Sequence, residues 1–429
     1  METYAQILIY ASPAFFLLVM GEKLYGKYVK GDDFKWMDMI SSLSSGYTNT
    51  LKDVLGIGLS LLTYVWLYEK VALIHIEFTW LNVLLAFIAL DFAGYWGHRL
   101  NHQINFFWNQ HLVHHSSEEF NLACALRQSI SDLIKFFTIF LLPAALLGVD
   151  PTIIAIVAPI HLFAQFWYHT TYIGKMGWLE KIIVTPSHHR VHHAINPIYI
   201  DKNHGQIFIF WDKWFGTFQE ELPDVPPVYG ITRPVRTWNP IKINYQHLWL
   251  LMKDAYRAKN WKDKFRVWYM PTGWRPKDVE EKYPEFKIDD PYNFEKYNPS
   301  ISKNLQAWSW VQFIVTFTFL MIFFTAIPEL EIRELFMYGF FLFFSVYAYT
   351  ELMDKNPNAF WQELLKNGFG LFIYVQHGTW FGMEQMGLAW NVLVPIYFVS
   401  ATLVTGYFVF VELRDTQTIS IVGQQKSAA

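Results

Sequence analysis

Residues 185–193 read TPSHHRVHH, and the stretch places four histidines within six consecutive positions. The whole chain of 429 residues has 15 histidines, so this local density is unusual. Within the stretch, His189, His192 and His193 form the pattern HxxHH. Residues i, i+3 and i+4 share one side of an α-helix. The pattern therefore predicts a helix that presents three imidazoles to one point, with His188 one step away from that face.

Other histidine motifs precede this stretch. One repeats HxxHH over residues 111–115, and the other is HxxxH over residues 98–102, while His169 comes just after a predicted span. Nine imidazoles exceed what one four-ligand site uses, so two metal ions are the economical interpretation. The predicted ligands are His98, His102, His111, His114, His115, His169, His189, His192 and His193.

The composition indicates a membrane protein. The chain is 53% hydrophobic and only 17% charged, whereas soluble domains carry about 25% charged residues. Its formal net charge of -3 gives no reason to expect a nucleic-acid partner. The single cysteine, Cys124, rules out an intramolecular disulfide and a cysteine-rich metal site.

Nine apolar stretches approach the length of roughly 20 residues that a spanning helix needs. The predicted fold is therefore all-α, a polytopic membrane helical bundle of nine spans with a cytoplasmic histidine-rich helical cap. The predicted spans are Tyr4–Met20, Thr48–Leu67, Leu73–Trp96, Leu133–Val149, Pro151–Tyr168, Ala307–Ile327, Leu335–Leu352, Gly368–Met383 and Leu388–Val411.

The distribution of basic residues predicts the orientation. Lysines at 23, 27, 30 and 35 follow the first apolar stretch, which we take as a retained span rather than a signal peptide. The loop after that span should be cytoplasmic, and counting spans onward places all histidine motifs on the same side. We expect four parts: N-terminal spans (1–90), a histidine-box core (91–221), a cytoplasmic segment rich in Pro and aromatic residues (222–304) and C-terminal spans (305–429).

Two features of the chain leave alternatives open. In the cytoplasmic segment, residues 248–259 have helical spacing with an apolar side, which suits either an in-plane interfacial helix or a helix packed on the cap. His188 and His204 could each be a ligand, a donor that orients a ligand, or neither. We expect the isolated histidines at 75, 161, 247 and 377 to be structural.

All-imidazole ligation suits Zn, Cu, Fe or Ni, and the spacing does not choose among them. A metal bound by neutral imidazoles keeps its full charge, so we expect nearby acids to orient the ring N–H groups. These acids are Asp91, Glu118, Glu119 and Asp201. The HExxH motif of metalloproteases is absent from the sequence.

The three histidine motifs resemble the fatty acid hydroxylase and sterol desaturase superfamily of membrane di-iron oxygenases. The phrase HHSSEEFNLACALRQS (114–129) is similar to that superfamily beyond its histidines. Residues 185–193, with DKN at 201–203 and WDKWFGTF at 211–218, look most like the alkylglycerol monooxygenase family. The chain departs from the usual pattern at Gln165, where many members have histidine, and at His204, where that family has tyrosine.

The resemblance implies activation of O2 at two Fe ions and hydroxylation of a lipid C–H bond, with ether-lipid cleavage as the specific outcome. It also implies an electron donor, tetrahydrobiopterin in that family, and a membrane lipid as substrate. The implied location is the endoplasmic reticulum of a eukaryote or the cytoplasmic membrane of a bacterium, with the site on the cytoplasmic side. Glu118, Asn121 and Asp201 are the expected catalytic residues.

Two other functions stay open from the sequence. The same motifs suit a desaturase or hydroxylase of sterols or acyl chains, and product mass would distinguish the two reactions. A metal transporter could also use clustered histidines. A transport path requires ionisable residues within the spans, and Asp91 is the main acid found there.

Overall fold

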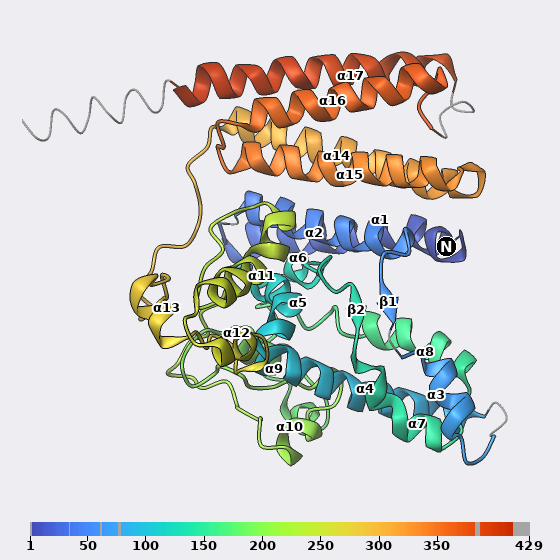
Figure 1. Ribbon diagram of the computed structural model, residues 1–429, viewed down its shortest axis with the longest axis vertical. Coiled ribbons are helices and arrows are strands. Elements are labelled where there is room, and N and C mark those ends of the chain that lie inside the picture. Colours follow the sequence, from blue (N-terminus) through green and yellow to red (C-terminus); the bar gives the residue numbers. More distant parts are fainter. Residues whose placement is uncertain (1, 34, 61, 76–78, 382–386, 415–429) are drawn as a thin grey trace, which may run out of the picture. The chain divides into compact units, whose positions relative to one another are not determined.

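The computed structural model describes residues 2–33, 35–60, 62–75, 79–381 and 387–414 (Figure 1). Among these residues the fold is almost entirely helical, and the one named strand pair joins β1 (Leu59–Ser60) to β2 (Ile134–Lys135) in parallel. The predicted all-α class is therefore confirmed.

The chain forms two compact units. The first, here the bundle unit, comprises Met1–Gly56, Thr237–Ile241 and Tyr297–Ala429. The second, here the histidine unit, comprises Ile57–Arg236 and Lys242–Lys296. The four-part division expected from the sequence stays a prediction.

Long helices make up the bundle unit, with aromatic side chains between them. Tyr47 stacks on Phe313 and Phe317 with ring centroids 5.0 and 5.1 Å apart, and the Trp380 ring is fully buried. Helix α14 packs against α15, α15 against α16, and α16 against α17 (Figure 1). The helices are α1 (Glu2–Tyr25), extended by the π-helical turn Gly26–Lys30, α2 (Trp36–Val54), α14 (Lys303–Ala326), α15 (Ile332–Met353), α16 (Ala359–His377) and α17 (Leu388–Tyr407).

Within the described residues, five helices are long and apolar enough to cross a membrane. Four belong to the bundle unit: Ala5–Lys30, Lys303–Glu329, Ile332–Met353 and Ala389–Glu412. The fifth, Trp80–Gln103, belongs to the histidine unit. The prediction of a membrane protein is supported, whereas the count of nine spans is not confirmed.

Two of the predicted spans are wrong as continuous helices. In Thr48–Leu67, helix α2 ends at Val54, Gly56 takes a left-handed φ of 65°, and a new helix starts at Tyr64. In Leu133–Val149, the chain passes through strand β2 and a short 3-10 helix before a five-residue helix. Apolar composition marked both stretches, but glycine and proline interrupt their backbone ladders.

Two further predicted spans are helical but fall short of the requirements. Helix α8 (Pro151–Phe163) has 13 residues, about 20 Å at 1.5 Å per residue, against a hydrocarbon core of about 30 Å. Helix α16 carries the buried ion pair Lys366–Glu363 in its first half. Residues 382–383 of the predicted span Gly368–Met383, and 76–78 of Leu73–Trp96, lie outside the described residues.

The histidine unit is built on α4, which packs against α5 and α8 (Figure 1). Only Ile104 separates α4 from α5, and its extended backbone turns the chain back so that the two helices pack together. The helices of this unit are α3 (Tyr64–Val71), α4 (Trp80–Gln103), α5 (Asn105–His115), α6 (Leu122–Ala125), α7 (Leu142–Leu146), α8, α9 (Pro186–His192), α10 (Phe210–Trp214), α12 (Trp261–Tyr269) and α13 (Lys277–Lys282), with most of α11 (Pro240–Arg257).

Candidate di-metal centre

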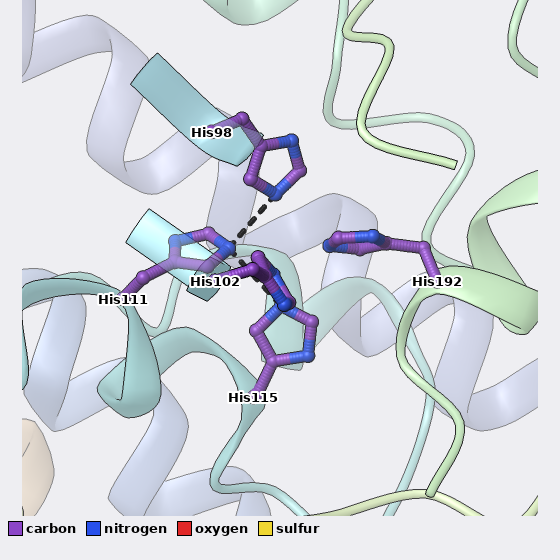
Figure 2. A group of neighbouring side chains, drawn as sticks. All are labelled: His98, His102, His111, His115 and His192. Atoms are coloured by element: carbon purple, nitrogen blue, oxygen red, sulfur yellow. Dashed lines mark hydrogen bonds between the residues drawn. The ribbon is translucent and has the colours of Figure 1, made fainter. Parts of the chain in front are cut away.

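Five histidines of the histidine unit converge into a first group, whose ligand atoms all lie within 4.8 Å of one another. The Nε2 atoms of His98 and His111 are 2.8 Å apart, and those of His111 and His115 are 3.0 Å apart. Metal–nitrogen bonds of about 2.1 Å put neighbouring ligand atoms of an octahedron about 3.0 Å apart. The group therefore fits one metal ion. Its members, shown in Figure 2, are His98, His102, His111, His115 and His192.

The five rings form a square pyramid. Around the base, the rings of His98, His111, His115 and His192 follow one another with centroids 4.4–4.7 Å apart, and the opposite rings of His111 and His192 are 6.2 Å apart. His102 lies 4.7–5.3 Å from all four and forms the apex. The position opposite His102 has no sixth imidazole from the described residues in this group.

Four more histidines form a second group within the same 4.8 Å limit. The Nε2 of His189 is 2.8 Å from that of His169 and 3.0 Å from that of His193. The Nε2 atoms of His114 and His169 are 3.3 Å apart. All nine histidines predicted from the sequence therefore lie in two clusters, and each cluster fits one ion.

Each HxxHH motif contributes histidines to both groups. The prediction that one motif presents all three imidazoles to a single point is therefore wrong. On α5, His111 and His115 join the first group while His114 joins the second. In the motif of α9, only His192 joins the first group, while His189 and His193 join the second. Residues i and i+4 diverge by about 40° around a helix, whereas i+3 and i+4 diverge by about 100°, so the middle histidine faces the other group.

The loop Asp201–His204, here the orienting loop, contacts the Nδ1 atoms of three histidines in the first group. The Nδ1 of His98 donates to the His204 carbonyl at 2.8 Å, and that of His192 donates to the Lys202 carbonyl at 2.9 Å. The Nδ1 of His102 lies 3.3 Å from Oδ1 of Asp201. A carbonyl oxygen only accepts, so Nδ1 of His98 and Nδ1 of His192 carry the proton, and the negative charge of Asp201 favours a proton on Nδ1 of His102. In each of the three rings Nε2 then keeps its lone pair for a metal.

Buried hydrogen bonds hold the orienting loop in place, although two of its residues have a strained backbone. Asp201 and Asn203 take left-handed φ angles of 56° and 55°. The Asn203 amide donates to the His188 carbonyl at 3.1 Å and to the Gln219 carbonyl at 2.7 Å. The buried Asp212 accepts from the backbone N–H groups of His204 and Gly205, each at 2.7 Å. Such conformations persist only where their surroundings over-determine them, which is the case here.

In the second group, backbone carbonyls again orient the rings. The Nδ1 of His114 contacts the Arg127 carbonyl at 3.2 Å, and the Nδ1 of His169 contacts the carbonyl of Gln165 at 3.1 Å. The Gln165 side chain instead donates to the His161 carbonyl, so it does not replace the missing histidine within this group. The tautomers of these rings are thus fixed as in the first group.

Asp91 does not take the predicted role of orienting one of these nine rings. Its carboxylate contacts Nε2 of His161 at 2.9 Å and accepts from the indole N–H of Trp211 at 2.8 Å. It also accepts from the backbone N–H groups of Ile207 and Phe208. Asp91 therefore ties the segment after the orienting loop to α4, and His161 has the structural place expected for it.

The imidazoles of the two groups have the free lone pairs and the neutral charge that a metal ligand needs. The Nε2 of His192 is buried and lacks a hydrogen-bond partner among the described residues, which leaves its lone pair available to a metal. Burial lowers the pKa of His114 to about 4, which keeps its imidazole neutral at physiological pH as a ligand must be. Burial, reinforced by the neighbouring imidazoles, also lowers the pKa of His111, His115, His189, His192 and His193.

His204 lies beside the first group without belonging to it. Its ring centroid is 5.0 Å from that of His102 and 5.6 Å from that of His98. Its Nε2 donates to the Asp201 carbonyl at 3.1 Å, so Nδ1 carries a lone pair, and this atom is buried without a partner among the described residues. The ring covers the outer side of the pyramid, away from the position opposite His102.

Two of the predicted catalytic residues, Asn121 and Glu118, make contacts with residues other than the nine histidines. The Oδ1 of Asn121 accepts from the backbone N–H groups of Ala123 and Cys124 and thereby caps α6. The backbone carbonyl of Glu118 accepts from Nζ of Lys296 at 2.7 Å. The side chain of Asp201 contacts His102, one of the nine histidines.

Sequence reasoning missed the aromatic and backbone surroundings of the site. Phe120 packs against the ring of His193 at a centroid distance of 5.2 Å, and Trp108 packs against His102 at 5.1 Å. The carbonyls of Lys202 and Arg127 carry no signal in a sequence because every residue has one. Phe120, by contrast, follows the second motif directly and could have been considered.

Comparison with known proteins places this site in a class. The profile of the Fatty acid hydroxylase family matches residues 83–217, which contain both histidine groups. A Delta(7)-sterol 5(6)-desaturase of Aspergillus fumigatus is 27% identical over 179 residues, which cover 35% of this chain and 55% of that protein. The chain is thus an oxygen-dependent oxidoreductase that acts on lipids.

Longer matches define the family more narrowly. The alkylglycerol monooxygenase of Homo sapiens is 33% identical over 373 residues, which cover 85% of this chain and 81% of that protein. That of Danio rerio is 33% identical over 373 residues, with 83% and 79% covered. The chain belongs to the alkylglycerol monooxygenase family. No solved structure matches it significantly.

Proposed function

We propose that the protein holds two iron ions in its two histidine groups and uses O2 to hydroxylate an ether lipid at the carbon next to the ether oxygen. The observation that carries the proposal is the pair of buried all-histidine groups in a chain of the alkylglycerol monooxygenase family. Imidazole ligands suit iron, and the family resemblance selects iron from the metals that imidazoles bind. The family also supports an enzyme over the metal-transport alternative.

The reaction balances with a two-electron reductant. One oxygen atom of O2 enters the C–H bond, and the other leaves as water after taking two electrons and two protons. The resulting hemiacetal breaks its C–O bond and gives a fatty aldehyde and a glycerol hydroxyl. The metals, when bound, supply the O2 activation that no side chain provides. We extend the proposal to tetrahydrobiopterin as the reductant because of the family resemblance.

The chain's own residues set the conditions for this chemistry. His115, His189 and His193 are each at most 4% exposed, which excludes water from the reacting atoms. The orienting loop fixes the proton of His98, His102 and His192 on Nδ1, so that Nε2 stays available. Phe120 and Tyr168 add apolar walls beside the second group.

We further propose a multi-pass arrangement with the site on the cytoplasmic side, in the endoplasmic reticulum of a eukaryote or the cytoplasmic membrane of a bacterium. The basic residues that follow the first span support this orientation. Glu118 and Asn121 remain proposed catalytic residues, while the contact with His102 favours a positioning role for Asp201.

The test uses protein purified anaerobically, loaded with ferrous iron and supplied with an alkylglycerol, tetrahydrobiopterin and 18O2. We expect a fatty aldehyde that carries 18O, trapped at once by reduction to the alcohol before its oxygen exchanges with water. Unlabelled aldehyde, or no oxidation product from iron-loaded protein, would refute the proposal.

Desaturation is the second candidate, because a sterol desaturase is among the matching proteins. Mass spectrometry of the lipid separates the two reactions, since desaturation removes two hydrogens and hydroxylation adds one oxygen. A product two mass units lighter than a sterol or acyl substrate would select this alternative.

A further inference from the structure

Two helices of the histidine unit expose an apolar face. On α11, the residues that follow one another on the exposed side are Tyr245, Trp249, Met252 and Tyr256, which are 39–87% exposed. On α12, Trp261, Phe265 and Tyr269 are 57–70% exposed. These seven residues are here the aromatic face.

The exposed side of α11 carries these large apolar groups together with Gln246, while its buried side combines apolar and polar groups. Asn244 and Asp254 are fully buried. The Asp254 carboxylate pairs with the Arg275 guanidinium at 2.6 Å, and Oδ1 of Asn244 accepts from the backbone N–H of Ile130 at 2.8 Å. The buried polar groups of α11 thus have hydrogen-bond or ion-pair partners within the unit. The large apolar groups of its outer side lie at the surface.

Hydrogen bonds fix both helices to the end of the candidate span α4. Asn105, two residues after α4 ends, donates from its amide to the Val267 carbonyl at 3.0 Å and from its backbone N–H to the Met270 carbonyl at 3.1 Å. Its carbonyl accepts from Nε2 of His247 on α11 at 3.1 Å. The helices that carry the aromatic face are therefore attached beside the C-terminal end of the candidate span α4.

The charge around the aromatic face suits an anionic lipid surface. Residues 242–269 contain seven basic and two acidic residues, and one of the acids, Asp254, is neutralised by Arg275. Lys259, between the two helices, and Lys262, in the first turn of α12, are exposed. Trp and Tyr are enriched at membrane–water boundaries, and basic residues near an anionic lipid surface are attracted to it.

We propose that the aromatic face of α11 and α12 inserts into the interfacial layer of the bilayer that α4 enters, with lipid headgroups as its partner. The two helices lie in the membrane plane and fix the histidine unit at the surface. This docking is independent of the chemistry at the histidine groups.

A spin-label experiment on the full chain tests the proposal. The single cysteine, Cys124, is buried, so labels introduced by Tyr256→Cys and Phe265→Cys report on their own sites once background labelling of the parent protein is subtracted. The matched control is Lys277→Cys on α13, because the Lys277 side chain is 91% exposed. Each labelled protein is reconstituted in vesicles of phosphatidylcholine and phosphatidylserine.

Oxygen concentrates in the bilayer, and a nickel chelate stays in water, so their collision rates with the label report its depth. We expect the labels at 256 and 265 to favour oxygen over the chelate several-fold more than the label at 277 does. Equal ratios at all three sites would overturn the proposal. Exclusion of both reagents from 256 and 265 would also overturn it, because a protein surface would then cover the face.

Discussion

The Asp201 carboxylate lies 3.3 Å from Nδ1 of His102, the ring at the apex of the first histidine group. The negative charge of Asp201 favours a proton on this nitrogen, which leaves Nε2 of His102 available to a metal. The same short loop fixes His98 and His192 through backbone carbonyls. One turn of chain therefore controls three of the five imidazoles at this position.

Substitution of Asp201 separates positioning from direct catalysis. Asp201→Ala removes the oxygen that faces Nδ1 of His102, and losses of this kind cost about 10–100-fold in metal affinity. Because the Asp201 side chain is 46% exposed, we expect the lower end of that range. Asp201→Asn keeps an acceptor oxygen and should bind metal nearly as the parent does. Competition with a chelating dye measures both, and unchanged affinity in Asp201→Ala alongside lost turnover would instead assign Asp201 to catalysis.

A matched pair of variants on α9 tests which histidines bind metal. His192→Ala removes a ligand of the first group, so we expect one of two metals to be lost and activity to fall at least about 100-fold. His188→Gln is the control, since His188 belongs to neither group and glutamine preserves the capping box with Thr185. Metal analysis of both proteins decides the matter. If His188→Gln loses metal and His192→Ala does not, the ligand assignment is wrong.

Metal removal should destabilise the protein, because both groups gather neutral imidazoles that a bound cation holds together. A ligand at 100 times its Kd adds about 2.7 kcal/mol to the free energy of unfolding. Chelation should therefore lower the thermal midpoint by on the order of 5 °C or more. Scanning calorimetry with and without chelator, followed by iron restoration, measures the shift. Identical midpoints would show that no metal binds the folded state preferentially.

The pH dependence of stability should change when a buried histidine outside the metal groups is replaced. Burial lowers the pKa of His247 to about 4, whereas the unfolded chain binds this proton near pH 6.5. Between those values the unfolded state holds more protons, so acid destabilises the fold, on the order of 3 kcal/mol at pH 4 from this residue. His247→Gln retains a donor for the Asn105 carbonyl. We expect equal thermal midpoints at pH 7.5 and a shallower loss towards pH 5 in the variant, whereas parallel curves would contradict the account.

The local spacing of histidines was sufficient to predict eight of the nine residues that gather, because HxxHH and HxxxH keep their geometry on any helix. The ninth, His169, was predicted from its position just after an apolar stretch. It was not sufficient to predict the division of His114 from His115, since that depends on where α4 and α9 meet α5. Two of the predicted spans are not continuous helices for a similar reason. The stretch 133–149 is apolar, yet Pro143 and its neighbours break it into short pieces that pack against α4.

Asp201–His204 shows what lies beyond sequence reasoning. The sequence predicted Asp201 both as an acid that orients a ring N–H and as a catalytic residue. Its place beside His102 depends on two left-handed residues and on the bonds that Asp212 accepts. The carbonyls of Lys202 and His204 have no sequence signature. Long-range packing, which no local pattern encodes, assembles this part of the site.

The iron content of the protein purified without oxygen tests the central claim most directly. Elemental analysis of the full chain, saturated with ferrous iron and freed of excess, should give two irons per polypeptide. His111→Ala and His189→Ala, which each remove one ligand from a different group, should each give one. A value of one or none for the parent, or loss of both irons from either variant alone, would contradict two separate histidine-bound metals.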